Sequence, residues 1–335
     1  MLGLSLFAAA CSISDPIFTG IDAQSPPGTA ILTVSRNGAA TGTVSSNPGG
    51  ITCGASCSAI FPLGTVVTLT ATPDTGAEFA GWSGGGCSGS APTCMVTVAA
   101  ATTVTATFEV ATYPVMIHLG GAGTGMVVAP AAGIICPGTC TAMVPHGGQL
   151  SLTASTGASS LFMGWTVNGG GTACAGTGAC ASTITGPTTI TATFALYQSL
   201  EVTKSGNGNG TVTSNPTGIT CGADCSESYP PGTTVTLTAT AAGDSIFMGW
   251  SGGGCAGSGT CSVDVNGATM VTADFALKRY DLTVTKAGLG AGTVMSAPAG
   301  IDCGATCTAA YDAGTLVTLT ASPAAGSLFA GWSGG

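Results

Sequence analysis

The sequence predicts an all-β protein built as a tandem array of small disulfide-stapled modules, three complete and one truncated. A Phe-x-Gly-Trp motif occurs four times in the 335 residues and contains all four tryptophans, which are 83, 85 and 82 residues apart. A fixed period of this size is typical of tandem repeats. Within each period apolar residues alternate with threonine, which indicates half-buried strands, and no segment of ten or more residues has helical apolar spacing.

The first repeat shows the expected order of strands. A short apolar alternation at 32–34 and a glycine-rich turn precede the segment 42–44, and a longer alternation follows at 67–71. The Phe-x-Gly-Trp segment at 79–82 and a closing strand at 104–108 complete the repeat. Only a short turn separates 67–71 from 79–82, so we expect these two strands to pair antiparallel. Each repeat is expected to have five to seven strands.

The Phe-x-Gly-Trp motif is expected to supply the core of each repeat. Burial of one indole and one phenyl contributes on the order of 2 to 3 kcal/mol each. The glycine before each tryptophan is expected where a side chain would clash or where a β-bulge re-orients the ring. The expected core residues are Phe79, Trp82, Phe162, Trp165, Phe247, Trp250, Phe329 and Trp332.

The period divides the chain into six segments. The last repeat stops three residues after Trp332, before the closing strand that the other repeats have. We therefore expect a truncated and frayed fourth repeat, with an unpaired edge and an exposed core. The expected segments are a signal peptide at 1–10, a tether at 11–30, and repeats at 31–110, 111–196, 197–278 and 279–335.

The start of the chain has the features of an export signal. The apolar segment Met1 to Ala10 ends in small residues just before Cys11, which resembles a bacterial lipoprotein signal whose cleavage leaves a lipid-bearing cysteine. A plain secretory signal with an incidental cysteine is the alternative. No run of about 18 apolar residues follows, which excludes a spanning helix. The prediction is an exported envelope protein, lipidated at Cys11, attached to the outer membrane by lipid alone and exposed at the surface.

The other fourteen cysteines fall into seven close pairs. An even set at recurrent spacing behind an export signal indicates disulfides. The second repeat has four extra residues between Trp165 and Cys174 while each pair keeps its spacing, which favours bonds within pairs. Bonds between pairs would close longer loops and stabilise more in the chain-entropy model, so they remain an alternative. The pairs are Cys53 and Cys57, Cys87 and Cys94, Cys136 and Cys140, Cys174 and Cys180, Cys221 and Cys225, Cys255 and Cys261, and Cys303 and Cys307.

A four-cysteine zinc site in each repeat is the competing interpretation of these pairs. Two pairs per repeat supply enough thiolates for a tetrahedral site, but the usual C-x2-C spacing is absent and an exported chain is oxidised. We therefore expect neither a metal nor a cofactor. Metal content and free thiols of the purified protein distinguish the two interpretations.

The sequence gives no sign of a catalytic site. The only histidines, His118 and His146, lie in the second repeat, where they are expected at the surface, and no carboxylate recurs in all four repeats. The glycine clusters fit hairpin turns better than phosphate loops, because their spacing is wrong and no helix follows. The five Lys and Arg residues form no basic patch, which argues against nucleic-acid binding. We predict no catalytic residues and no enzyme activity.

The combination of T-L-T-A, F-x-G-W and T-A-T-F, repeated from about residue 31 to 335, resembles the divergent relatives of the internalin B-repeat. That family consists of tandem modules in bacterial surface and secreted proteins. The resemblance implies a compact β-grasp-like module, strung in series as a stalk or interaction array without enzyme activity. A small sandwich is the other architecture compatible with the strands.

Two functions follow as hypotheses. The first is a non-enzymatic, lipid-anchored stalk or adhesion array at the cell surface, in contact with polysaccharide or other surface proteins. The second is a spacer for a catalytic or binding domain missing beyond the truncated end. Self-assembly through sheet edges is a further option.

Overall fold

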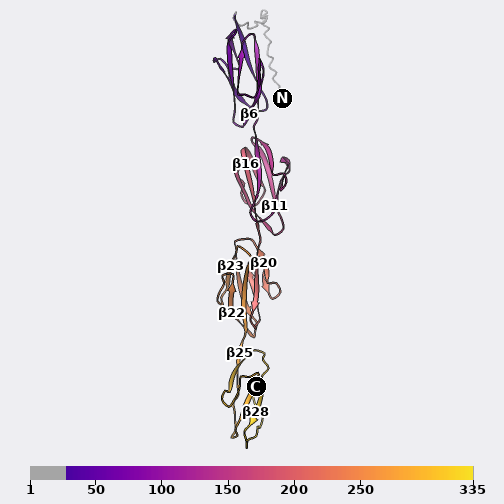
Figure 1. Cartoon of the computed structure of the whole chain (residues 1–335), viewed down its shortest axis with the longest axis vertical. Helices are drawn as coiled ribbons and strands as arrows, with labels where there is room; N and C mark the ends of the chain where they lie inside the picture. Colours follow the sequence, from indigo (N-terminus) through magenta and orange to yellow (C-terminus); the bar gives the residue numbers. More distant parts are fainter. Residues whose placement is uncertain (1–27, 335) are drawn as a thin grey trace, which may run out of the picture.

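The computed structural model describes residues 28–334, and these form four all-β modules in series. Figure 1 shows the modules in line, with β6 in the first and β28 in the last. Each module has its own cluster of buried apolar residues. The predicted all-β tandem fold is confirmed, whereas the predicted signal peptide and Cys11 lie outside the described residues.

The first repeat is a two-layer sandwich rather than a β-grasp-like module. One sheet has the order β4-β1-β9-β6-β7 and the other has the order β3-β2-β5-β8. Neighbouring strands are antiparallel except β1 and β9, which run parallel over residues 32–37 and 102–107. The strands are β1 (Thr29–Asn37), β2 (Gly42–Asn47), β3 (Thr52–Cys53), β4 (Ser58–Pro62), β5 (Val66–Pro73), β6 (Ala77–Gly84), β7 (Cys87–Gly89), β8 (Thr93–Thr97) and β9 (Thr102–Val110).

The third repeat has the same two layers, with sheet orders β20-β17-β24-β22 and β19-β18-β21-β23. Its first and last strands again run parallel. The strands are β17 (Gln198–Ser205), β18 (Gly210–Asn215), β19 (Thr220–Cys221), β20 (Ser226–Tyr229), β21 (Thr233–Ala241), β22 (Ser245–Gly252), β23 (Cys261–Val265) and β24 (Thr269–Leu277).

The second repeat joins its two layers through one long strand. β16 pairs with β14 at its start and with β10 and β15 further along, so it belongs to both layers. The elements are β10 (Thr112–Gly120), β11 (Gly125–Ala129), the 3-10 turn η1 (Pro130–Ala132), β12 (Ile134–Cys136), β13 (Thr141–Pro145), β14 (Gly148–Thr156), β15 (Ser160–Gly171) and β16 (Cys180–Leu196).

The strand count differs from the expected five to seven in the first and third repeats, which have nine and eight. The extra strands are short pieces such as β3, β7 and β19, of two or three residues. An alternating pattern needs at least four residues to be recognised, so these pieces give no signal in the sequence.

The fourth repeat has two two-stranded sheets, β25-β27 and β26-β28. Phe329 and Trp332, predicted as core residues of a repeat whose core is exposed, are 46% and 51% exposed. In the first repeat the corresponding Phe79 packs against Phe108 of β9, and the fourth repeat has no counterpart of β9 in this sequence. The strands are β25 (Arg279–Thr283), β26 (Gly292–Ala297), β27 (Thr308–Asp312) and β28 (Thr318–Pro323).

The expected antiparallel pairing of the strand before the turn with the Phe-x-Gly-Trp strand is wrong. In the first repeat β5 pairs with β2 and β8, whereas β6 pairs with β9 and β7. The chain between them, residues 74–76, therefore crosses from one sheet to the other. Alternation requires only that one side of each strand be buried, and an arch between two sheets satisfies this as well as a hairpin does.

The glycine of the Phe-x-Gly-Trp motif has both of the expected roles. The register of β6 against β9 shifts between Phe79 and Gly81, which is a β-bulge. Gly81 has φ +151°, and a Cβ there would lie 3.0 Å from the Gly89 carbonyl oxygen. The bulge turns Trp82 inward, where it is 5% exposed.

Candidate functional site: disulfide-closed edges and the junctions between repeats

Each complete repeat has two disulfides, and in the first repeat both join the two sheets. In the first repeat Cys53 lies on β3 and bonds Cys57, whose carbonyl accepts from Val34 N–H of β1 in the opposite sheet. Cys87 on β7 bonds Cys94 on β8, again from one sheet to the other. The two bonds therefore close the two open sides of the sandwich.

The same pairing recurs along the chain, with Cys303 and Cys307 as the pair in the fourth repeat. Every disulfide joins two cysteines that are four to seven positions apart in the sequence. This is the pairing within close pairs and not the alternative that closes long loops. The remaining disulfides are Cys136–Cys140, Cys174–Cys180, Cys221–Cys225, Cys255–Cys261 and Cys303–Cys307.

Each buried tryptophan is tied to the loop that the second disulfide closes. The indole Nε1 of Trp82 donates to the Ala91 carbonyl oxygen at 2.9 Å, inside the loop from Cys87 to Cys94. Trp165 and Trp250 donate in the same way, to Gly178 at 2.8 Å and Gly259 at 2.7 Å. The disulfide thus orders the backbone acceptor that a buried indole N–H requires.

Successive repeats are joined by a single residue, which we call the linker residue. Ala111, Tyr197 and Lys278 are the linker residues, each between the last strand of one repeat and the first strand of the next. Their backbone N–H groups donate to Gly76, Ser159 and Asp244 carbonyl oxygens at 2.9, 3.0 and 2.9 Å, in the turn before the Phe-x-Gly-Trp strand. Each linker residue is therefore held by the repeat that precedes it.

At two junctions the following repeat holds the linker residue as well. His146 N–H donates to the Ala111 carbonyl at 2.8 Å, and Ala313 N–H donates to the Lys278 carbonyl at 2.8 Å. Pro231 occupies this position in the third repeat, and proline has no N–H to donate to Tyr197. The second junction therefore has one of these two backbone hydrogen bonds and lacks the other.

The first junction is also packed by side chains. A Cβ on Gly76, which has φ +78°, would lie 2.2 Å from Cδ2 of His146. The His146 ring lies edge-on to Tyr113, with 5.9 Å between ring centroids, and its Nδ1 is buried without a hydrogen-bond partner. Of the two histidines, expected at the surface, His118 is exposed on β10 whereas His146 is half-buried between two repeats.

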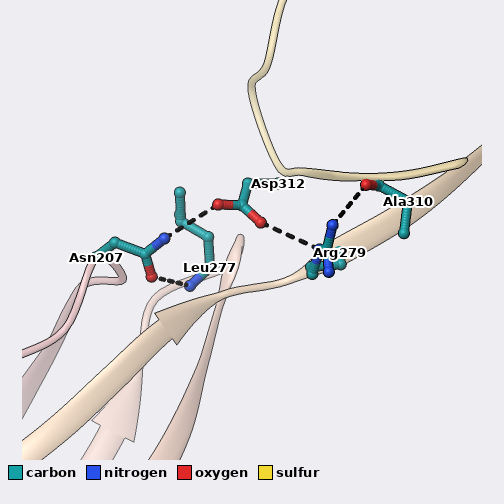
Figure 2. Close-up of polar contacts among 5 residues, drawn as sticks. All are labelled: Asn207, Leu277, Arg279, Ala310 and Asp312. Atoms are coloured by element: carbon teal, nitrogen blue, oxygen red, sulfur yellow. Dashed lines mark hydrogen bonds and ion pairs between the residues drawn. The ribbon is translucent and has the colours of Figure 1, made fainter. Parts of the chain in front are cut away.

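The third junction has a polar side-chain network (Figure 2). Asn207 Nδ2 of the third repeat donates to Asp312 Oδ2 of the fourth at 3.1 Å, while Asn207 Oδ1 accepts from Leu277 N–H at 3.1 Å. Arg279 lies 3.4 Å from Asp312 Oδ1 and donates to the Ala310 carbonyl at 2.7 Å. The Arg279 and Asp312 side chains are 64% and 39% exposed, so water and salt screen the pair and its contribution is about 1 kcal/mol or less.

Each of the five Lys and Arg side chains donates a hydrogen bond to a backbone carbonyl oxygen. Arg36, Lys204 and Lys286 each cross the glycine-rich turn of their repeat, to Gly42, Gly210 and Gly292 at 2.8, 3.1 and 3.2 Å. Lys278 and Arg279 donate to carbonyls at the third junction. This distribution places the five cations at four separate turns and junctions rather than on one basic face.

Nothing in the described part of the chain forms a group of three or more His, Cys, Asp or Glu side chains that could hold a metal ion. Among residues 28–334, no helix has the length and hydropathy needed to cross a membrane. Sequence reasoning missed the junction residues Asn207, Asp312 and Gly76, because their partners belong to a neighbouring repeat. The one signal available was the absence of any spacer between the closing strand of one repeat and the opening strand of the next.

Comparison with known proteins identifies the repeat. The family model described as "Divergent InlB B-repeat domain" matches residues 32–112, 126–198, 200–279 and 282–335, which is most of the chain. No curated protein matches the chain.

Several bacterial proteins are among the solved structures with some likeness. They include the Bacillus anthracis TIE protein, 9% identical with a TM-score of 0.25, where the match covers 88% of this chain and 61% of that one. The pilus adhesin SpaC of Lactobacillus rhamnosus GG, in an open conformation, is 10% identical with a TM-score of 0.22 and coverages of 77% and 44%. Two B repeat units of the Staphylococcus aureus collagen-binding protein CNA are 11% identical with a TM-score of 0.14 and coverages of 88% and 92%. The chain therefore spans less than two thirds of the length of the TIE protein and of SpaC.

Proposed function

Because the chain belongs to the divergent InlB B-repeat family, we propose that it is a non-enzymatic stalk that projects from the bacterial cell surface. The observation behind this proposal is the construction of the junctions. One linker residue separates neighbouring repeats, and the preceding repeat holds its N–H in a backbone hydrogen bond. Joints this short restrict the angle between modules, which suits a chain whose task is to span distance.

The stalk role is tested by changing the number of repeats. Deletion of residues 111–196, which removes the second repeat with its linker, should shorten the reach of the protein by one module. An epitope placed after the last repeat then becomes less accessible to antibody on intact cells. The matched control replaces the second repeat and its linker by a copy of the third with its own linker, residues 197–277, and should keep full accessibility. Equal antibody binding in the deletion and the control would refute a spacing role.

We propose Cys11 as the lipid attachment site that fixes this stalk to the outer membrane. The support is the apolar segment that ends in small residues just before it. The test is metabolic labelling with a palmitate analogue in the wild-type chain and in Cys11→Ser. Label in the wild type alone supports the anchor, and an unlabelled wild-type chain that is nevertheless exported refutes it.

A second proposal concerns contact with neutral polysaccharide, for which the outward faces of the sheets give support. In the first repeat Thr43 faces Thr72 and Ser45 faces Thr70 across β2 and β5. Hydroxyl and methyl groups without charge suit a partner that is itself uncharged and rich in hydroxyls. A glycan array probed with the full chain tests this, with other surface proteins of the cell as the alternative partners. Binding only to charged glycans, or to none, would count against the polysaccharide.

A further inference from the structure

Every methionine in the described part of the chain lies at the surface. Methionine is normally among the residues most often buried, so a complete set of exposed ones is unusual. The exposed fractions are 72% for Met95, 53% for Met116, 43% for Met126, 61% for Met143, 50% for Met163, 54% for Met248, 56% for Met270 and 56% for Met295.

The cores of the repeats are made of other residues. Valine, leucine, isoleucine, alanine, aromatic residues and disulfide cysteines form all four buried clusters. Among residues 28–334 all cysteines are in disulfides. The sulfur atoms open to two-electron oxidation in this region are therefore the eight thioethers, and all eight belong to exposed residues.

Two of the eight lie at a β-bulge of the repeat. Met163 and Met248 are the variable residue of the Phe-x-Gly-Trp motif in the second and third repeats, where Ala80 stands in the first. At each of these positions the register shifts, so the methionine is the extra residue of a β-bulge and has no partner across the ladder. The bulge therefore turns the thioether outward while the neighbouring tryptophan turns inward.

We infer that these eight methionines are modification sites for peroxide-type oxidants, and that the array retains its fold when all eight are converted to methionine sulfoxide. The thioether sulfur attacks one oxygen of hydrogen peroxide, the O–O bond breaks, and the second oxygen leaves as water once it has taken up the remaining proton. Sulfur gives up two electrons and peroxide accepts them. Hypochlorous acid reacts in the same sense and releases chloride and a proton.

The fold tolerates this change because of where the new oxygen lies. Sulfoxide formation disrupts proteins when it places a polar group in an apolar core or interface. Here each oxygen is added to a side chain already in water, so no desolvation cost arises. The buried indoles, such as Trp82 at 5% exposure, lie behind the sheets and are shielded.

The test treats the full chain with excess hydrogen peroxide and follows each methionine by peptide mass spectrometry. We expect a gain of about 16 Da at each of the eight sites at rates close to that of free methionine, with circular dichroism and melting temperature unchanged. A site among the eight that stays unmodified while free methionine is consumed would overturn the inference. Loss of the β-sheet signal on oxidation would overturn it as well.

Leu152→Met provides the matched control, because Leu152 is fully buried and this exchange conserves volume. The buried thioether should be oxidised roughly tenfold or more slowly than the surface ones as long as the repeat stays folded. If it reacts at the same rate, exposure does not govern reactivity and the inference fails. A variant with all eight surface methionines changed to leucine is the second control. It should gain no oxygen within residues 28–334. Any oxygen that it does gain there identifies an oxidised group other than these methionines and counts against the inference.

Discussion

At the scale of single residues, the tryptophan of each complete repeat has the largest expected effect on stability. Trp82 packs edge-on to Phe79, with 5.0 Å between ring centroids, and its indole N–H is bound in the disulfide loop. Trp82→Ala removes this burial and leaves a cavity, so we expect a loss of about 3 to 5 kcal/mol in the first repeat, measured by calorimetry.

Trp332→Ala is the control for this substitution within the same chain. Trp332 keeps its contact with Phe329 but is 51% exposed. Its removal should cost clearly less than the removal of Trp82. Equal losses at the two positions would show that the indole stabilises through local contacts with its own strand and not through the core.

Gly76 at the first junction is required both by its positive φ and by the close approach of the His146 ring. Two substitutions distinguish these two reasons. Gly76→Ala and Gly64→Ala both place alanine at a positive φ, +78° and +83°, which costs about 1 to 2 kcal/mol. Only the Cβ at Gly76 meets His146, whereas nothing lies within 4 Å of one at Gly64. We expect Gly76→Ala to widen the distribution of distances between labels on the first and second repeats, measured by pulsed electron spin resonance. Gly64→Ala should leave that distribution unchanged, and the same widening from both would contradict the role of His146.

At the scale of elements, the disulfides act on the edges of the sandwich. The double change Cys53→Ala with Cys57→Ala frees β3 from the opposite sheet, and loss of so small a loop costs about 2 kcal/mol in the chain-entropy model. We expect faster hydrogen exchange in β3 and β4, while the central β9 changes little. If hydrogen exchange became equally faster in all strands of the repeat, the Cys53–Cys57 disulfide would stabilise the whole module and not its edge.

The longer strands were predictable from the sequence, but the short ones and the arrangement of the strands were not. Alternation such as Val67, Leu69 and Ala71 identifies a strand with one buried face, and close cysteine spacing indicates local bonds. Sheet membership depends on contacts that the pattern does not encode, such as the parallel pairing of Leu32 with Thr102, seventy residues apart. The junction contacts were out of reach for the same reason, because Asn207 and Asp312 meet only after both repeats are folded.

At the scale of the whole molecule, the three junctions are expected to differ in stiffness. The second lacks the backbone donor that His146 and Ala313 supply at the first and third, because Pro231 stands in their place. Pulsed spin-resonance distances across each junction should therefore be distributed most widely between the second and third repeats. Pro231→Ala restores an N–H and should narrow that distribution, while His146→Pro should widen the one at the first junction. If the distance distributions across the three junctions were equally wide, and neither substitution changed them, the backbone hydrogen bond would not determine the stiffness of the junctions.

Four β modules with one-residue joints form an extended rod (Figure 1). Small-angle X-ray scattering of the full chain measures this directly. Four nine-residue strands end to end span roughly 120 Å, which predicts a radius of gyration of at least about 35 Å, whereas a compact domain of this length has about 20 Å. A value near 35 Å or above, with the scattering profile of a rod, agrees with the stalk. A value near 20 Å would mean that the repeats fold back on one another, and would contradict it.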